Sequence, residues 1–353
     1  LYLEADNRDQ AEATLQGIIN GQGLEPEGLK ARTALARLRV QQEEIDSATA
    51  LLDEVLAENP KDGDALLLKG RIELQQEKYT EAIASFRSVL KGQPDSAQAL
   101  TLLAMAHQGN GETELAKENL ARAVEAKPDD AETRLRLAQF LASTGDIDGA
   151  LEQVNAGLEI EPANVAMIRA KAELLAKQGN AEELEETLTL LEQASPETGL
   201  GASGKGRLYK QQKKYPEAVA AFDEALARDP DSVLALTEVV NTEIAMGDPD
   251  AAIKRLDAVL KDNPEHPAAH DLLGVAYAAK KDFARAEQEF TRQLEINPNS
   301  SLVYMQLAGA RSGQGNTGGA EAALKKGLEV LPGDTRLTVA LATFYGQQGD
   351  MDK

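Results

Sequence analysis

The stretch PAAHDLLGVAYAAKKDFARAEQEFTRQLEINPNS, residues Pro267–Ser300, decides the fold because the rest of the chain restates its pattern. Apolar and small residues in Leu272–Tyr277 recur at helical spacing, and a second helical period includes Phe290 and Leu294. The second period ends before Pro298, since proline lacks a backbone donor and biases its predecessor away from the helical region. The stretch therefore predicts two amphipathic helices joined by a tight turn.

Prolines at a spacing of 34 residues extend this unit over the chain. Ten of the 13 prolines share one register, with no insertion or deletion between the first and the last: Pro26, Pro60, Pro94, Pro128, Pro162, Pro196, Pro230, Pro264, Pro298 and Pro332. The other three, Pro216, Pro249 and Pro267, lie where helices are expected to begin, a position that tolerates proline. The chain is therefore predicted to be an array of one repeated unit.

Small residues mark the place where the two helices of a unit cross. In the first helix they are Ala36, Gly70, Ala104, Ala138, Ala172, Gly206, Gly274, Ala308 and Ala342, with Val240 as the departure. In the second helix they are Ala48, Ala82, Ala116, Ala150, Ala218, Ala252, Ala286 and Ala320, with Thr14 and Leu184 as departures. One turn later comes a large apolar residue, here called the plug: Ile18, Leu52, Phe86, Leu120, Val154, Leu188, Phe222, Leu256, Phe290 and Leu324. Small crossing residues let the helices approach closely enough for the plug to enter the core.

In its period, its crossing residues and its plugs, the chain resembles the tetratricopeptide repeat family over essentially its whole length. The resemblance implies an all-α fold, a right-handed α-solenoid superhelix of stacked helix-turn-helix repeats. We expect a partial repeat over residues 1–28, nine complete units over 29–334 and the first helix of a truncated repeat over 335–353. The units begin at Leu29, Gly63, Ala97, Ala131, Val165, Gly199, Val233, Pro267 and Ser301.

The two ends of the chain suggest a fragment of a longer array, because both fall inside a repeat and the chain lacks an initiator methionine. Without a capping helix, we expect the last helix to expose Leu337, Leu341, Phe344 and Tyr345. The alternative is that another copy of the chain covers this end, which predicts a homo-oligomer formed through exposed terminal helices.

The net charge of −22 argues against nucleic acids and anionic membrane surfaces as general partners. The chain has no cysteine, which excludes disulfides and thiol chemistry and fits the cytoplasm and a bacterial periplasm or envelope equally well. No apolar run approaches the roughly 20 residues of a membrane-spanning helix, so no direct membrane insertion is expected in this segment.

The sequence GLGASGKG, residues 199–206, carries four glycines where a first helix should begin. It resembles phosphate-binding loops, but those follow a strand, and none is expected here. Each glycine inside a helix costs about 1 kcal/mol relative to alanine. We therefore predict a hinge between residues 184 and 206, where Leu184 also replaces a small crossing residue and the helix starts late or frays.

The three histidines give no candidate for catalysis or metal binding. His266 and His270 are four residues apart, but Pro267 between them predicts that His266 lies outside the helix. His107 is expected alone on a helix surface. We predict no enzyme activity and neither cofactor nor metal.

What remains is a binding surface. The resemblance implies that first helices line a concave groove, which maps the candidate peptide-binding residues to Arg37, Arg71, Arg169, Lys177, Arg207 and Lys210, beside Lys30 and the acidic Asp64, Glu132, Glu173 and Asp271. The basic groups would accept carboxylates of a protein or peptide ligand. The alternative is that they are solvated charges, which contribute little to binding.

We therefore expect a non-catalytic scaffold or adaptor that binds peptide segments in its concave groove. Two alternatives remain open. One is a structural array that assembles end to end. The other is a repeat segment of a larger protein, such as a bacterial envelope, exopolysaccharide or protein-sorting assembly protein or a regulated enzyme.

Overall fold

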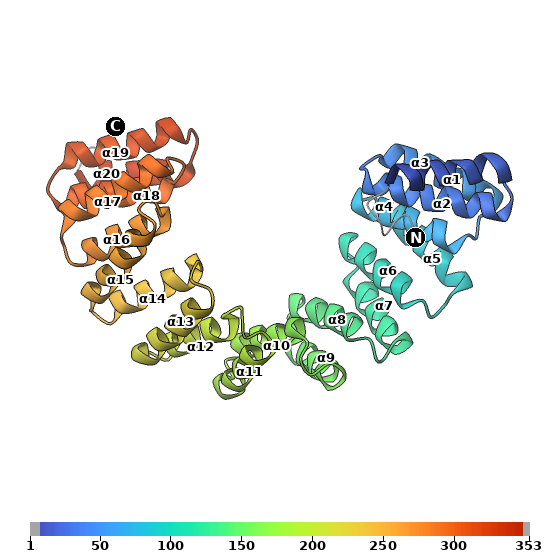
Figure 1. Ribbon diagram of the computed structural model, residues 1–353, viewed down its shortest axis with the longest axis horizontal. Coiled ribbons are helices and arrows are strands. Elements are labelled where there is room, and N and C mark those ends of the chain that lie inside the picture. Colours follow the sequence, from blue (N-terminus) through green and yellow to red (C-terminus); the bar gives the residue numbers. More distant parts are fainter. Residues whose placement is uncertain (1–7, 349–353) are drawn as a thin grey trace. The chain divides into compact units, whose positions relative to one another are not determined.

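The computed structural model describes residues 8–348, and this part of the chain forms twenty α-helices and no strand. Packing between helices divides the chain into two compact units, the first ending at Gly179 and the second beginning at Asn180. Within each unit the helices form a stack in which a helix packs mainly on those next to it in sequence (Figure 1). The all-α solenoid expected from the sequence is confirmed for each unit.

The first unit contains ten helices. In order, α1 to α10 are Arg8–Gln22, Pro26–Gln41, Ile45–Glu58, Gly63–Gln75, Tyr79–Gly92, Ala97–Gly109, Thr113–Ala126, Ala131–Ser143, Ile147–Ile160 and Val165–Gln178. Even-numbered helices are the first helices of the predicted repeats, and odd-numbered helices are the second helices.

The second unit contains the other ten described helices. In order, α11 to α20 are Ala181–Ala194, Leu200–Gln211, Tyr215–Arg228, Val233–Ala245, Pro249–Asp262, Pro267–Ala279, Phe283–Ile296, Ser301–Gly313, Thr317–Val330 and Thr335–Gln348. Pro216, Pro249 and Pro267 lie in the first turn of their helices, as predicted.

The start of the array departs from the predicted register. Pro26 follows the second helix α1, as predicted, but it also begins α2, three residues before the predicted start at Leu29. The predicted plug Ile18 is 38% exposed, whereas Ile19 is 8% exposed and packs with Leu35 of α2. The assignment of Ile18 was therefore wrong, because α1 turns its next residue toward α2.

A left-handed residue closes the turn inside each complete repeat. These residues are Glu43, Glu77, Gly111, Gly145, Gly179, Lys213, Gly247, Lys281 and Gly315, all with positive φ. In the first turn the backbone N–H of Glu43 donates to the carbonyl of Val40 at 3.1 Å, and that of Glu44 donates to Arg39 at 2.9 Å. These bonds satisfy carbonyls left over at the helix end. The tight turn predicted between the two helices of a repeat is therefore present at each of these residues.

The crossing residue is matched in size to its plug. A Cβ atom added to Gly70 would lie 2.5 Å from Cε1 of Phe86, which is closer than real contacts allow. The same distance separates Gly206 from Phe222 and Gly274 from Phe290. Each phenylalanine plug thus faces a glycine, because its ring fills the space that a Cβ would need. Aliphatic plugs face alanine or a larger residue: Leu52, Leu120, Val154, Leu188, Leu256 and Leu324.

The glycines of α12 have the same explanation. α12 begins at Leu200, one residue after the predicted unit start, and continues to Gln211. A Cβ atom added to Gly204 would lie 2.3 Å from Cδ2 of Leu188, and one added to Gly201 would lie 2.5 Å from the carbonyl oxygen of that leucine. These glycines allow α11 and α12 to pack closely. The hinge over residues 184–206 stays a prediction.

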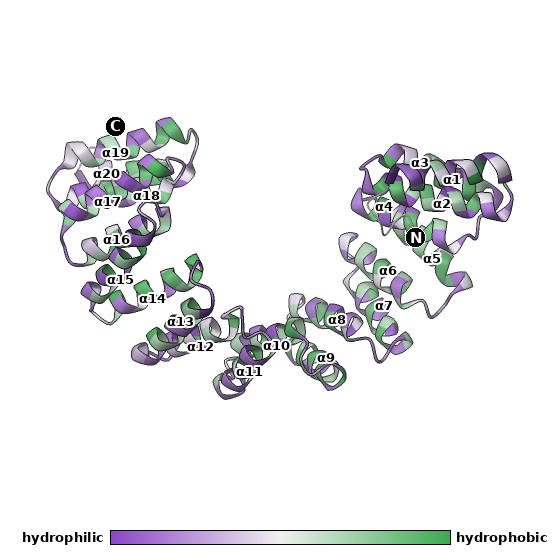
Figure 2. Ribbon diagram, viewed as in Figure 1, coloured by the Kyte–Doolittle hydropathy of each residue, from purple (hydrophilic) through white to green (hydrophobic). Residues whose placement is uncertain are grey.

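Hydrophobic and hydrophilic residues are mixed along the described helices, as expected for helices with one face in a core (Figure 2). None of the described helices combines the length and the apolar character needed to cross a membrane.

Candidate binding surface

Three first helices of the first unit present an exposed side chain at the same repeat position. Counted from the predicted unit starts, position 9 is Arg37 in α2, Arg71 in α4 and Met105 in α6, and all three are exposed. They are 34 residues apart, so each occupies the same place on its helix. The repeat therefore aligns two guanidinium groups and a thioether along one face of this unit.

Two hollows join these side chains into one groove. A hollow of about 610 Å³ is lined by Arg37, Arg71, Leu102 and Met105, and one of about 410 Å³ shares the last three and extends to Arg136 of α8. We call Arg37, Arg71, Leu102, Met105 and Arg136 the arginine groove.

Two of the three arginines in the arginine groove are unneutralised, while the carboxylates of Asp130 and Glu132 also line its second hollow. Neither Arg37 nor Arg71 forms an ion pair or side-chain hydrogen bond with another described residue, whereas Arg136 donates to Glu132 at 2.6 Å. A guanidinium can bind a carboxylate through two parallel hydrogen bonds. Met105 is 42% exposed and adds apolar surface beside these groups. The groove therefore suits a segment that carries both acidic and apolar side chains.

The other predicted binding residues are not gathered in this way. Arg169 and Lys177 lie on α10 in the first unit, where both are exposed and Arg169 is 4.0 Å from Glu173. Arg207 and Lys210 lie on α12 in the second unit, and Lys210 Nζ is 2.7 Å from Glu238 Oε2. Of the six predicted residues, Arg37 and Arg71 are the two that line one hollow.

Three first helices of the second unit expose a leucine at the same repeat position. Leu200, Leu234 and Leu302, at position 2 of α12, α14 and α18, are 38%, 58% and 50% exposed. These leucines and Met105 were not among the predicted binding residues, because the predicted residues were all charged. Their shared repeat position was the signal that could have found them.

The histidines are occupied by structural contacts. His107 was predicted on a surface, but it is 1% exposed, and its Nδ1 lies 2.5 Å from Glu112 Oε2. The prediction was wrong because this face of α6 turns toward the second helix of its own repeat. His266 caps α16 by accepting from the N–H of Ala269 at 3.1 Å. Both ring nitrogens of His270 have partners, at 2.6 Å in Glu289 and 3.0 Å in Pro264.

The described residues contain no group of three histidine or carboxylate side chains placed to hold a metal ion. The glycine-rich stretch has α11 before it instead of a strand, and Lys205 Nζ is 2.8 Å from Glu192 Oε2. Lys205 is therefore neutralised within the fold, and Gly199 serves as the left-handed N-cap of α12.

The last described helix, α20, is less exposed than predicted. Leu337 is fully buried and packs with residues of α18 and α19, so its predicted exposure was wrong. Leu341 and Phe344 are half-buried, and the Tyr345 hydroxyl donates to Glu321 at 2.7 Å. Val339 is 59% exposed.

Comparisons with known proteins agree with this geometry. Two models described as tetratricopeptide repeat match the sequence, one over residues 33–97 and the other over residues 73–132, 107–174, 209–276 and 243–311. The matches cover more than half of the chain. No curated protein matches the sequence.

Solved structures are similar at low sequence identity. Yeast Tom70 is 14% identical, with 99% of this chain and 87% of that chain covered and a TM-score of 0.52. A tetratricopeptide repeat protein from Parabacteroides merdae ATCC 43184 is 19% identical, with 70% of this chain and 98% of that chain covered and a TM-score of 0.48. At such identities the similarity concerns the fold alone.

Proposed function

The chain belongs to the tetratricopeptide repeat family, and on that premise we propose that it is a non-catalytic scaffold that binds segments of partner proteins on the exposed faces of its first helices. Repeats of this family generally mediate protein–protein interaction. Their fold generally serves as a scaffold without catalysis. The arginine groove is the observation that carries the proposal for this chain.

The ligand we propose for the arginine groove is a protein segment with acidic side chains beside apolar ones. Arg37 and Arg71 supply two unneutralised guanidinium groups one repeat apart, and Met105 supplies an adaptable apolar surface. In a chain of net charge −22, two such groups are a local exception to the surrounding potential. They favour an acidic segment here over other parts of the acidic surface.

Selection from a random peptide library on the full chain tests this proposal. We expect the selected peptides to be enriched in Asp or Glu next to Leu, Ile or Met. The double variant Arg37→Glu, Arg71→Glu should lose this enrichment and bind the selected peptides about tenfold or more weakly, because each lost charge-assisted hydrogen bond contributes about 1.5–3 kcal/mol.

The matched control carries the same charge change elsewhere. Lys61 and Lys261 are exposed and have no ion pair with another described residue, so Lys61→Glu, Lys261→Glu should keep the selection of the parent chain. If the Arg37→Glu, Arg71→Glu variant selects the same peptides as the parent, the arginine groove is not the binding site.

A further inference from the structure

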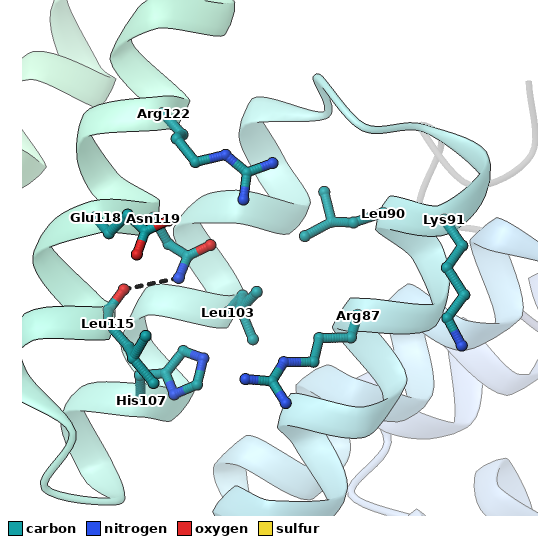
Figure 3. A pocket seen from close by; sticks show the side chains of 9 residues that line it. All are labelled: Arg87, Leu90, Lys91, Leu103, His107, Leu115, Glu118, Asn119 and Arg122. Atoms are coloured by element: carbon teal, nitrogen blue, oxygen red, sulfur yellow. Dashed lines mark hydrogen bonds between the residues drawn. The ribbon is translucent and has the colours of Figure 1, made fainter.

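A separate hollow of about 320 Å³ in the first unit is lined by two second helices, α5 and α7, and by the first helix α6. Figure 3 shows that Arg87 and Arg122 extend toward it from opposite sides, with Asn119 and His107 at its inner wall. We call this site the Asn119 hollow. None of its lining residues belongs to the arginine groove.

Asn119 presents an unused hydrogen-bond acceptor at this site. Its side chain is buried, with 5% of the residue exposed, and Nδ2 donates to the carbonyl of Leu115 at 2.7 Å. A carbonyl can only accept, so the amide nitrogen must face Leu115 and the oxygen must point the other way. That oxygen, Oδ1, turns toward the hollow (Figure 3) and has no hydrogen-bond partner. A buried acceptor without a partner is unfavourable unless a ligand donates to it.

Three cations line the same hollow as that acceptor. Arg87, Lys91 and Arg122 line the hollow, and none forms an ion pair with another described residue. Glu118 is the carboxylate among the lining residues. The carboxylate of Glu112 is already held by His107 and lies outside the lining. The hollow thus has an excess of positive charge in a strongly acidic chain.

The same repeat positions in the second unit show what a closed version of this site looks like. Positions 11 and 23 of one repeat and position 25 of the repeat before it hold His107, Asn119 and Arg87 in the first unit. In the second unit they hold Glu243, Arg255 and Asp223.

In the second unit the three side chains satisfy one another. Arg255 Nη2 is 2.6 Å from Glu243 Oε1, and Arg255 Nη1 is 2.5 Å from Asp223 Oδ1. The cation lies in the middle and its carboxylates come from the chain itself. In the first unit position 25 carries a cation, Arg87, and position 23 carries a neutral acceptor, Asn119, so none of the three corresponding positions supplies a carboxylate.

From this arrangement we propose that the Asn119 hollow is a second binding site, which takes a carboxylate that has an N–H donor beside it. An acidic residue or the C-terminal residue of a partner peptide has this chemistry. Arg87, Lys91 and Arg122 bind the carboxylate, and Asn119 Oδ1 and Glu118 accept from the neighbouring N–H. A phosphate group fits less well, since it offers no N–H to these two acceptors.

Histidine ring resonances of the full chain, labelled with nitrogen-15 at histidine, report on this site. The probe is N-acetylglutamate, which carries carboxylates next to an amide N–H. We expect a saturable shift of the His107 signal, which a His107→Gln variant identifies, and smaller changes at His266 and His270. The double variant Arg37→Glu, Arg71→Glu should leave the shift unchanged, because its residues lie in the other groove.

Two variants test the assigned contacts. Asn119→Asp places a negative charge where the acceptor is and should abolish the saturable shift, and Arg122→Gln should weaken binding about tenfold. The control is Gln153→Glu, which adds the same charge at position 23 of the next repeat. Gln153 accepts from Arg134 at 3.2 Å, so a glutamate is tolerated there and should leave binding as it is.

Three outcomes overturn the proposal. The first is that N-acetylglutamate causes no saturable shift of the His107 signal. The second is that Asn119→Asp binds N-acetylglutamate with the same dissociation constant as the parent chain. The third is that inorganic phosphate saturates the site at a lower concentration than N-acetylglutamate does. Circular dichroism of each variant checks the fold, and Arg122→Gln, at an exposed position, provides the answer if Asn119→Asp unfolds the chain.

Discussion

One repeat in each unit uses the same positions for opposite chemistry. At positions 11, 23 and 25 the second unit forms an internal triad of Glu243, Arg255 and Asp223, whereas the first unit leaves Asn119 Oδ1 without a partner beside Arg87. At position 2 of their first helices, the second unit exposes Leu200, Leu234 and Leu302. The first unit has Lys30, Asp64, Gln98, Glu132 and Ala166 at that position.

The difference teaches that a repeat sets where a side chain lies and leaves its chemistry open. The buried positions are constrained by packing in both units, as Gly70 with Phe86 and Gly206 with Phe222 show. The exposed and half-buried positions are free to differ, because changing them opens no cavity in the core.

The largest effect is expected when the internal triad is broken. Arg255→Met leaves Glu243, which is 5% exposed, without its cation, and should lower the free energy of unfolding by about 3 kcal/mol. Its counterpart in the first unit is Asn119→Leu, which removes the hydrogen bond to Leu115 but also removes an acceptor that has no partner. The free energy of unfolding should therefore change by less than about 1 kcal/mol. Urea denaturation followed by circular dichroism measures both. Equal losses would mean that the two sites do not differ in the way described.

Overpacking of the helix crossing, in contrast, should lower the stability by the same amount in both units. Gly70→Ala and Gly206→Ala each force a Cβ atom against a phenylalanine ring and should cost about 1–3 kcal/mol. Adding Phe86→Leu to the first or Phe222→Leu to the second should recover part of the loss, because Ala and Leu form this pair elsewhere in the chain, as in Ala36 and Leu52. Thermal denaturation of the single and double variants measures the recovery, and its absence would contradict the size matching.

Glycine substitutions at the left-handed turn residues should stabilise the chain, whereas the alanine substitutions at the helix crossing destabilise it. Glu77 in the first unit and Lys213 in the second have φ values of 58° and 60°, where a side chain is unfavourable by about 1 kcal/mol. Glu77→Gly and Lys213→Gly should therefore stabilise the chain by up to about 1 kcal/mol each. Chemical denaturation checks this against Gly111→Ala, which should destabilise it. A loss of stability in both glycine variants would show that side-chain contacts outweigh the backbone strain.

The smallest expected effect is a pH-dependent change in melting temperature at Asp271, an acidic residue on the first helix α16. Burial raises the pKa of Asp271 above its ordinary value, so the folded chain holds this proton more tightly than the unfolded chain does. The stability contributed by this proton is present below the ordinary pKa and is lost as the pH rises through the raised pKa. Asp271→Asn should therefore raise the melting temperature at pH 7, and the gain should shrink as the pH falls.

Asp64 is the control for this pH dependence. It is exposed on α4, so Asp64→Asn should leave the melting temperature unchanged both at pH 7 and at lower pH. If Asp271→Asn behaves in the same way, burial of Asp271 has no effect on stability.

Much of the fold could be predicted because the repeat leaves redundant signals. Prolines at a constant interval and small residues at the helix crossing predicted the helix pairs and the tight turn between them. The errors fall where that redundancy ends. α2 begins at Pro26 itself, three residues before the predicted start. His107 lies inside, because no apolar period shows which polar residue faces a neighbouring helix.

The candidate site was predictable only in part. Arg37 and Arg71 followed from their shared repeat position, whereas Leu102 and Met105 emerged from the hollow that they complete. The Asn119 hollow had no signal in the sequence, since its residues come from three helices and none is unusual in its own repeat.

The sequence by itself determined the helical repeat, the turns within it and the matching of crossing residues to plugs, because each depends on contacts within a single repeat. The tertiary structure alone decided which charged groups are neutralised, which polar atoms lack partners and which side chains share a hollow. These properties depend on distances between side chains of neighbouring repeats. Periodicity specifies a residue's place on its own helix, but the direction and partner of a long side chain follow only from packing.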